Sequence, residues 1–124
     1  MEFRVKGNQC YPTMAEFKKL DESIYDVLKA IRRRPGMYIV EPSIYRLQAF
    51  LSGYTAGLLR AGFVLPDEGS LGLFQDWLIS RLGFTSSTSG WANMIREKSL
   101  SDKDAFERFF ILLDEFREGA GSQL

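Results

Sequence analysis

The most regular pattern in this sequence is a stripe of large apolar side chains near the C-terminal end. Phe106, Phe109, Phe110, Leu113 and Phe116 fall at helical spacing and therefore share one face of an α-helix. A helix with such a face is stable only when the face is buried against other elements. The stripe therefore predicts a helical fold in which aromatic rings hold the helices together.

Start and stop signals predict further helices along the rest of the chain. Ser, Thr or Asp precedes most apolar stripes, where the side chain can accept hydrogen bonds from the first N–H groups of a helix. Gly or Pro follows several stripes and ends them, because Gly adopts a left-handed conformation and Pro lacks a backbone N–H. These signals predict helices over residues 13–20, 21–34, 42–61, 70–82, around 91–95, and 101–118.

The remaining segments are predicted to connect these helices. Residues 1–12 can form a short strand or an irregular arm, residues 37–40 an extended apolar link, and residues 63–65 the start of a loop. We predict an all-α fold, a compact bundle of five to six helices with room for a short extended N-terminal segment. Residues 1–118 would form this single helical domain, and residues 119–124 a flexible C-terminal tail.

The charge of the chain bears on its partners and its location. The 124 residues include 16 basic and 16 acidic ones, so the formal net charge is zero. This balance argues against nucleic acid or an anionic membrane as partner, since both attract strongly basic surfaces. No apolar run approaches the ~20 residues that span a bilayer, and the N-terminus lacks the apolar region of a signal peptide. We expect a cytoplasmic protein without a membrane partner.

The residue types that usually carry catalysis are scarce. The sequence contains no histidine, the most common general base and metal ligand, and Cys10 has no second cysteine to pair with. Carboxylates occur as neighbours, as at Asp114 and Glu115, but adjacent side chains on a helix diverge by about 100° and make poor acid/base pairs. We therefore expect that the protein is not an enzyme and has no catalytic residue, metal or cofactor.

Three kinds of residue are candidates for binding another protein. A run of arginines at a helix end can bind carboxylate or phosphate. Tyr and Trp at turns or helix starts are typical anchors of interfaces. Paired acidic residues can form a contact surface for a basic partner. The candidates are Arg32, Arg33, Arg34, Tyr38, Tyr45, Asp67, Glu68, Trp91, Asp114 and Glu115.

One motif resembles part of a nucleotide-binding domain. Residues 34–39, Arg-Pro-Gly-Met-Tyr-Ile, are similar to a segment near the start of the ATPase domain of type II topoisomerases. In that family the next helix carries an acidic residue and an Asn that hold water and magnesium. Here residues 47–54 contain no carboxylate, and the Asp-x-Gly-x-Gly nucleotide motif is absent. Turn formation by Pro and Gly explains the segment instead.

A second resemblance extends over about residues 22–117. Its residues are Arg-Pro-Gly-Met-Tyr (34–38), Ser43-Ile44, Leu47, Phe50-Leu51, Gly53-Tyr54, Phe74, Trp77, Gly83, Gly90-Trp91 and the segment 109–116. Their order resembles that of small bacterial immunity proteins encoded beside secreted toxins. The resemblance implies a cytoplasmic, helical protein that binds one cognate toxin and blocks its active site or substrate access. The shared positions look like core and turn residues, so the toxin-facing ones would lie elsewhere on the surface.

Two other functions remain open at the level of sequence. A regulatory helical module would bind nucleic acid or another protein through Arg32–Arg34, with an affinity for nucleic acid that falls steeply with salt. An enzyme with an unfamiliar carboxylate site would need a concave polar pocket. The sequence does not identify the toxin, its activity, the contacting face or the oligomeric state.

Overall fold

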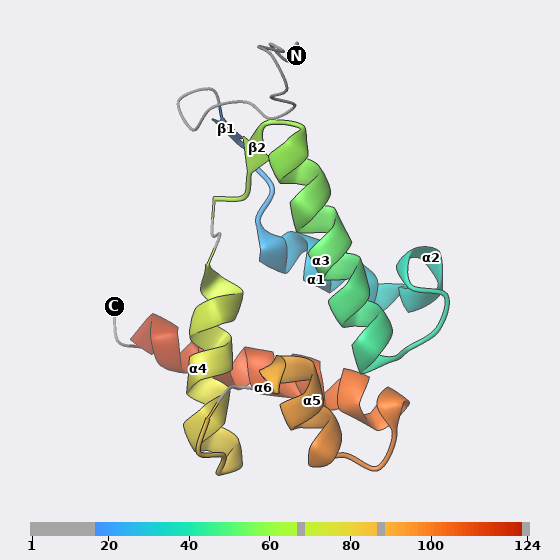
Figure 1. The fold of residues 1–124 in the computed structure, drawn as a ribbon, viewed down its shortest axis with the longest axis vertical. Helices are drawn as coiled ribbons and strands as arrows, with labels where there is room; N and C mark the ends of the chain where they lie inside the picture. Colours follow the sequence, from blue (N-terminus) through green and yellow to red (C-terminus); the bar gives the residue numbers. More distant parts are fainter. Residues whose placement is uncertain (1–16, 67–68, 87–88, 123–124) are drawn as a thin grey trace.

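The computed structural model describes residues 17–66, 69–86 and 89–122 of the chain. Within these ranges six helices and one pair of short strands form the fold (Figure 1), so the all-α prediction is confirmed. The elements are β1 (Lys18–Lys19), α1 (Ile24–Arg33), α2 (Pro35–Tyr38), α3 (Ile44–Arg60), β2 (Phe63–Val64), α4 (Ser70–Leu82), α5 (Gly90–Glu97) and α6 (Asp102–Ser122).

The last helix, α6, organises the arrangement of the others. It runs across the directions of α3 and α4 and contacts α3, α4 and α5 (Figure 1). The short helix α5 contacts the same two helices, α3 and α4, as well as α6. No helix in the described ranges combines the length and the apolar character that crossing a lipid bilayer requires.

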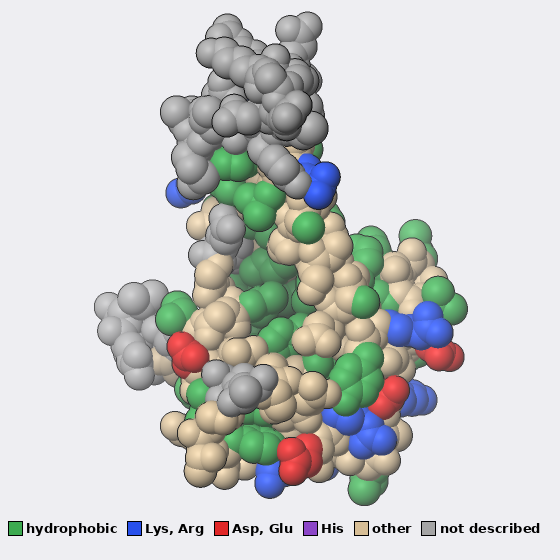
Figure 2. Space-filling view, in the orientation of Figure 1, with side chains coloured by type: hydrophobic (Ala, Val, Ile, Leu, Met, Phe, Trp, Pro, Cys, Tyr) green, Lys and Arg blue, Asp and Glu red, His purple; other side chains and the backbone are tan. Residues whose placement is uncertain are grey.

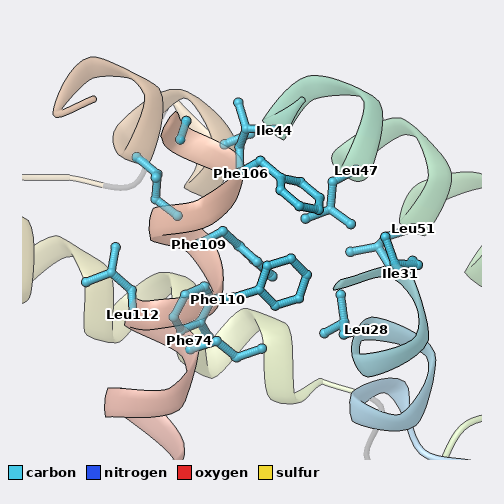
Figure 3. Close-up of a cluster of buried hydrophobic side chains, with 14 of the residues drawn as sticks. Leu28, Ile31, Ile44, Leu47, Leu51, Phe74, Phe106, Phe109, Phe110 and Leu112 are labelled. Carbon is cyan, nitrogen blue, oxygen red and sulfur yellow. The ribbon is translucent and has the colours of Figure 1, made fainter. Parts of the chain in front are cut away.

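The core is built from the predicted aromatic stripe and the apolar faces of the other helices. Phe74 and Phe109 are both fully buried, together with smaller side chains from α1, α3 and α5. The ring of Phe109 lies 5.5 Å from Phe74, 4.9 Å from Trp91 and 5.0 Å from Phe110, measured between centroids. Figure 3 shows Leu28, Ile31, Ile44, Leu47 and Leu51 of α1 and α3 facing the phenylalanine rings of α6. The aromatic stripe therefore joins α6 to α4 and α5.

Several predicted helix boundaries agree with the structure, and two differ. Gly62 and Gly83 follow α3 and α4 with φ angles of 85° and 79°, the left-handed conformation expected of a C-terminal glycine. The start of α1 is capped by Ser23, which forms a capping box with Asp26, so the predicted cap at Asp21 is wrong. Helix α6 continues to Ser122, beyond the predicted start of the tail at residue 119.

The strand pair replaces a predicted helix and a predicted loop. Lys18–Lys19 pairs in parallel with Phe63–Val64, and the Lys18 N–H donates to the Gly62 carbonyl at 2.8 Å. The prediction of a helix over residues 13–20 is therefore wrong for the part that is described, whereas residues 13–16 lie outside it. The pairing joins segments distant in sequence, which local propensity does not register.

We predict that Phe109→Ala lowers the free energy of unfolding by about 3–5 kcal/mol, because it leaves a cavity where three rings meet. Ile111→Ala is the matched control, since the Ile111 side chain on the same helix is 57% exposed. That change should cost less than about 0.5 kcal/mol. Urea unfolding followed by circular dichroism measures both, and equal effects would contradict this account of the core.

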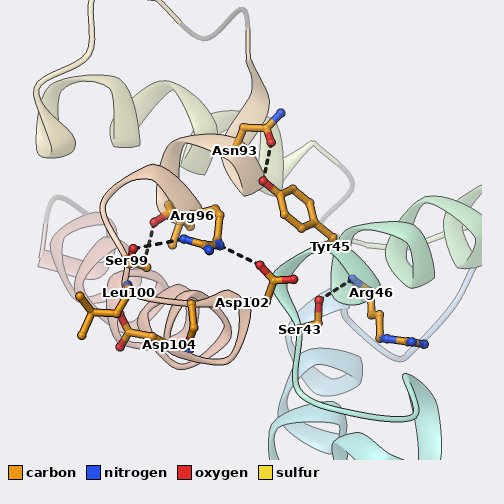
Figure 4. Close-up of polar contacts among 11 residues, drawn as sticks. Ser43, Tyr45, Arg46, Asn93, Arg96, Ser99, Leu100, Asp102 and Asp104 are labelled. Carbon is orange, nitrogen blue, oxygen red and sulfur yellow. Dashed lines mark hydrogen bonds and ion pairs between the residues drawn. The ribbon is translucent and has the colours of Figure 1, made fainter.

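The turn between α5 and α6 is held by polar side chains (Figure 4). The Asp104 carboxylate accepts a hydrogen bond from the Leu100 N–H at 2.8 Å, and the Ser101 hydroxyl accepts one from the Asp104 N–H at 3.0 Å. The Leu100 N–H, and to a smaller extent Arg108, holds the pKa of Asp104 below its usual range. The charged form of Asp104 therefore stabilises the start of α6.

Because the folded-state pKa of Asp104 is lowered, its stabilising effect is present at neutral pH and is lost as the pH falls through that pKa. We predict that the wild-type chain loses stability below about pH 4 more steeply than Asp104→Asn, which cannot titrate. Urea unfolding at a series of pH values measures the difference. Identical profiles for the two proteins would contradict the role given to this carboxylate.

Candidate protein-binding surface

Exposed apolar side chains gather where the chain passes from α1 through α2 towards α3. Met37 is 69% exposed, Val40 73% and Tyr38 40%. Arg33 and Arg34 precede them and, with Met37 and Tyr38, line a shallow hollow of about 330 Å³. We call the surface formed by Arg33, Arg34, Met37, Tyr38 and Val40 the α1–α2 corner.

Backbone hydrogen bonds fix the shape of the α1–α2 corner. Pro35 occupies the first turn of α2. The N–H groups of a first turn have no partner within the helix, so the missing N–H of Pro35 costs no hydrogen bond. The Ile39 N–H donates to the Pro35 carbonyl at 2.8 Å, and the Ile39 side chain is buried in the core. The predicted extended link over residues 37–40 is therefore wrong: the chain coils into α2 and is anchored by Ile39.

Val40 has an unusual backbone conformation. Its φ angle is 72°, and it is the non-glycine residue with positive φ among the described residues. The Glu41 N–H donates to the Ile39 carbonyl at 2.8 Å, which closes a tight turn around Val40. A three-residue turn with positive φ at its centre is strained, and a β-branched residue there is more so. The hydrogen-bonded turn keeps the apolar side chain of Val40 in solvent despite this strain.

The tyrosine of the α1–α2 corner is held from one side. The ring of Tyr38 lies edge-to-face with Phe50 at 6.0 Å, and Phe50 stacks on Tyr54 at 5.9 Å. This ring contact orients Tyr38 while leaving part of it accessible. An aromatic side chain held in this way loses little conformational entropy when it contacts a partner.

The predicted site residues divide into two sets. The structure brings Arg33, Arg34 and Tyr38 together at the α1–α2 corner. Arg32, however, forms an ion pair with Asp114 at 3.1 Å and lies 5.2 Å from the centroid of the Phe110 ring. Its guanidinium therefore joins α1 to α6, which sets it apart from its two neighbours in sequence.

The predicted acidic pair on α6 is also engaged within the molecule. Asp114 is the partner of Arg32. Glu115 accepts two hydrogen bonds from the Arg81 guanidinium, at 2.8 and 3.2 Å. This interaction lowers the pKa of Glu115 and raises that of Arg81. The two carboxylates face different arginines, as expected for neighbours on a helix.

The other predicted residues lie away from the α1–α2 corner or outside the described ranges. The Tyr45 hydroxyl donates to the Asn93 side-chain oxygen at 2.8 Å, which links α3 to α5 (Figure 4). Trp91 is half-buried, and its ring lies 4.9 Å from the ring of Phe109, measured between centroids. Asp67 and Glu68 lie outside the described residues.

Sequence reasoning missed Met37 and Val40 as surface residues. Both lie in an apolar run that favours burial on composition alone. The signal that could have found them is the short spacing between Pro35-Gly36 and Pro42. A turn this short cannot bury all of its side chains, because successive residues point in different directions.

A second hollow lies between α3 and α4. Figure 2 shows an apolar depression there, and its volume is about 280 Å³. Leu51, Leu59, Leu65, Leu71 and Trp91 contribute apolar walls, with a few polar side chains from α3. Within the described ranges, no three His, Cys, Asp or Glu side chains are grouped so that they could hold a metal ion.

Comparison with known proteins returned no match to a family model, a curated protein or a solved structure. The fold defines the chain as an all-α domain.

We predict that Val40→Gly raises the free energy of unfolding by about 1 kcal/mol, because glycine adopts positive φ without steric cost. Val40→Ala is the matched control: it removes the β-branch but keeps the Cβ, so it should recover only part of this gain. Urea unfolding measures both variants. A Val40→Gly protein that is less stable than wild type would contradict the strain assigned to this turn.

Proposed function

We propose that this chain is an immunity protein, which binds a cognate bacterial toxin domain and blocks its active site or substrate access. The observation that carries the proposal is the α1–α2 corner, where exposed Met37, Tyr38 and Val40 lie beside two arginines on a fixed turn. Large apolar and aromatic side chains together with arginine are typical of the centre of a protein–protein interface. The sequence resemblance to immunity proteins is the reason for proposing a bacterial toxin as the partner.

The proposed mechanism is steric occlusion without catalysis. A rigid surface can dock with little rearrangement, and backbone hydrogen bonds at 2.8 Å on both sides of Ile39 hold this turn in place. A standard interface covers ~800 Å² per partner. The corner would form its centre, and neighbouring side chains of α1 and α3 its rim. In the cell, the protein would act in the cytoplasm, where it would meet incoming toxin.

Binding of nucleic acid through Arg32–Arg34 is the alternative, and the charges of this segment argue against it. Asp114 neutralises Arg32, so two of the three arginines remain for phosphate contacts. Exposed Met37 and Val40 would lie against the phosphates without a favourable contact. A protein partner would form favourable contacts with both the arginines and the exposed apolar side chains.

Co-expression with the toxin domain encoded beside the gene tests the proposal. We expect the wild-type chain to rescue growth, and Met37→Asp/Val40→Asp to fail, with an affinity at least about 100-fold weaker, since it places charges in an apolar contact. The control is Leu73→Asp/Leu100→Asp, because both leucines are exposed and lie outside the α1–α2 corner. This control should rescue as wild type does.

The outcomes distinguish an error in the proposed immunity function from an error in the proposed binding surface. If the wild-type chain does not neutralise the toxin, or no toxin domain is encoded nearby, the immunity function is wrong. If both double variants rescue equally well, the α1–α2 corner is not the interface. Circular dichroism of each purified variant confirms that loss of rescue does not come from loss of folding.

A further inference from the structure

The arginines of the α1–α2 corner differ from the other arginines in their surroundings. Six other arginines form ion pairs or lie over rings: Arg32 with Asp114, Arg46 with Glu41, Arg81 with Glu115, Arg96 with Asp102, Arg108 with Asp104, and Arg117 over the Tyr25 ring. Among the described residues, neither Arg33 nor Arg34 has a carboxylate or a ring as partner. The Arg34 guanidinium donates a hydrogen bond to the Met37 sulfur at 4.0 Å.

The sequence neighbours of these arginines do not supply a counter-charge. The nearest carboxylate in the following turn, Glu41, pairs with Arg46 at 3.4 Å. The α1–α2 corner is therefore locally positive although the chain as a whole has a net charge of zero. Its charge lies at the edge of an exposed apolar set. Docking would remove water from both parts together, which strengthens any charge pair formed there.

We propose that the α1–α2 corner binds an acidic protein face, on which carboxylates flank an apolar hollow that receives Met37 and Val40. Each guanidinium of Arg33 and Arg34 would form a bidentate pair with a carboxylate, the geometry that arginine forms best. This inference rests on the proposed function for the identity of the partner, but its chemistry comes from the corner alone. A positive surface also accelerates association with an acidic partner.

The strained turn supports the same assignment. Val40 is 73% exposed with a φ angle of 72°, so the fold holds an apolar side chain outward against a conformational preference. Strain of this kind persists where it serves a contact. The apolar contact favours a protein face over a phosphate backbone, which has no apolar hollow for such a side chain.

A peptide selection tests this chemistry independently of the toxin. The probe is a random-peptide phage library selected on the immobilised full chain. Enriched peptides are then synthesised and their affinities measured for wild type, for Arg33→Ala/Arg34→Ala and for Arg33→Lys/Arg34→Lys. Lys98→Ala/Lys103→Ala is the control, because it removes the same charge from the C-terminal end of α5 and from α6.

We expect peptides that combine Asp or Glu with aliphatic residues. Their affinity should fall about 30-fold or more in the double alanine variant and stay unchanged in the control. The double lysine variant should keep the association rate but dissociate several-fold faster, because lysine keeps the charge and loses the bidentate geometry.

Three results would overturn the inference: enriched peptides that are neutral or basic, affinities that do not depend on Arg33 and Arg34, or no enriched peptide at all. Binding of a random DNA duplex at low salt that the double alanine variant abolishes would also overturn it, because it would assign the arginines to phosphate. Acidic peptides that bind the corner in a chain that fails to neutralise the toxin would refute the immunity function alone.

Discussion

The contact of the Phe109 ring with Phe74, Trp91 and Phe110 is the interaction on which the rest of the structure depends. It joins α6 to α4 and α5, while apolar side chains of α1 and α3 complete the core around it. The apolar face of α6 is therefore the surface against which most of the other helices pack. Burial of large rings stabilises such an arrangement more than a surface ion pair does. The fold therefore does not depend mainly on its exposed charged side chains.

The arginine side chains have different surroundings in different parts of the described surface. Several arginines link one element to another, as Arg32 links α1 to Asp114 on α6 and Arg81 links α4 to Glu115 on α6. At the α1–α2 corner the pattern reverses: the cations have no carboxylate among the described residues, and Val40 adopts a strained backbone. Natural proteins depart from local rules mainly at functional sites. The physical basis of the proposed interface is the contrast, among the described residues, between arginines that form ion pairs and the two arginines of the α1–α2 corner that form none.

The sequence predicted the helical class because the apolar residues of α1, α3 and α6 repeat with the period of a helix, and Gly62 and Gly83 mark two helix ends. It did not predict the strand pair, since Lys18 and Phe63 lie far apart in the chain. It also missed α2, because a single turn of helix leaves too few residues for a period to be recognised. For residues 37–40 the prediction depended on their apolar composition, which favours burial.

The candidate site was only partly contained in the sequence. The type of each residue, the absence of histidine and the run Arg32–Arg34 were fixed by the sequence alone. Tertiary structure decided that Arg32 meets Asp114, that Trp91 packs against the core, and that Met37 and Val40 remain exposed. The reason is physical: helical period depends on neighbours within one turn, whereas partners and exposure depend on how distant helices meet.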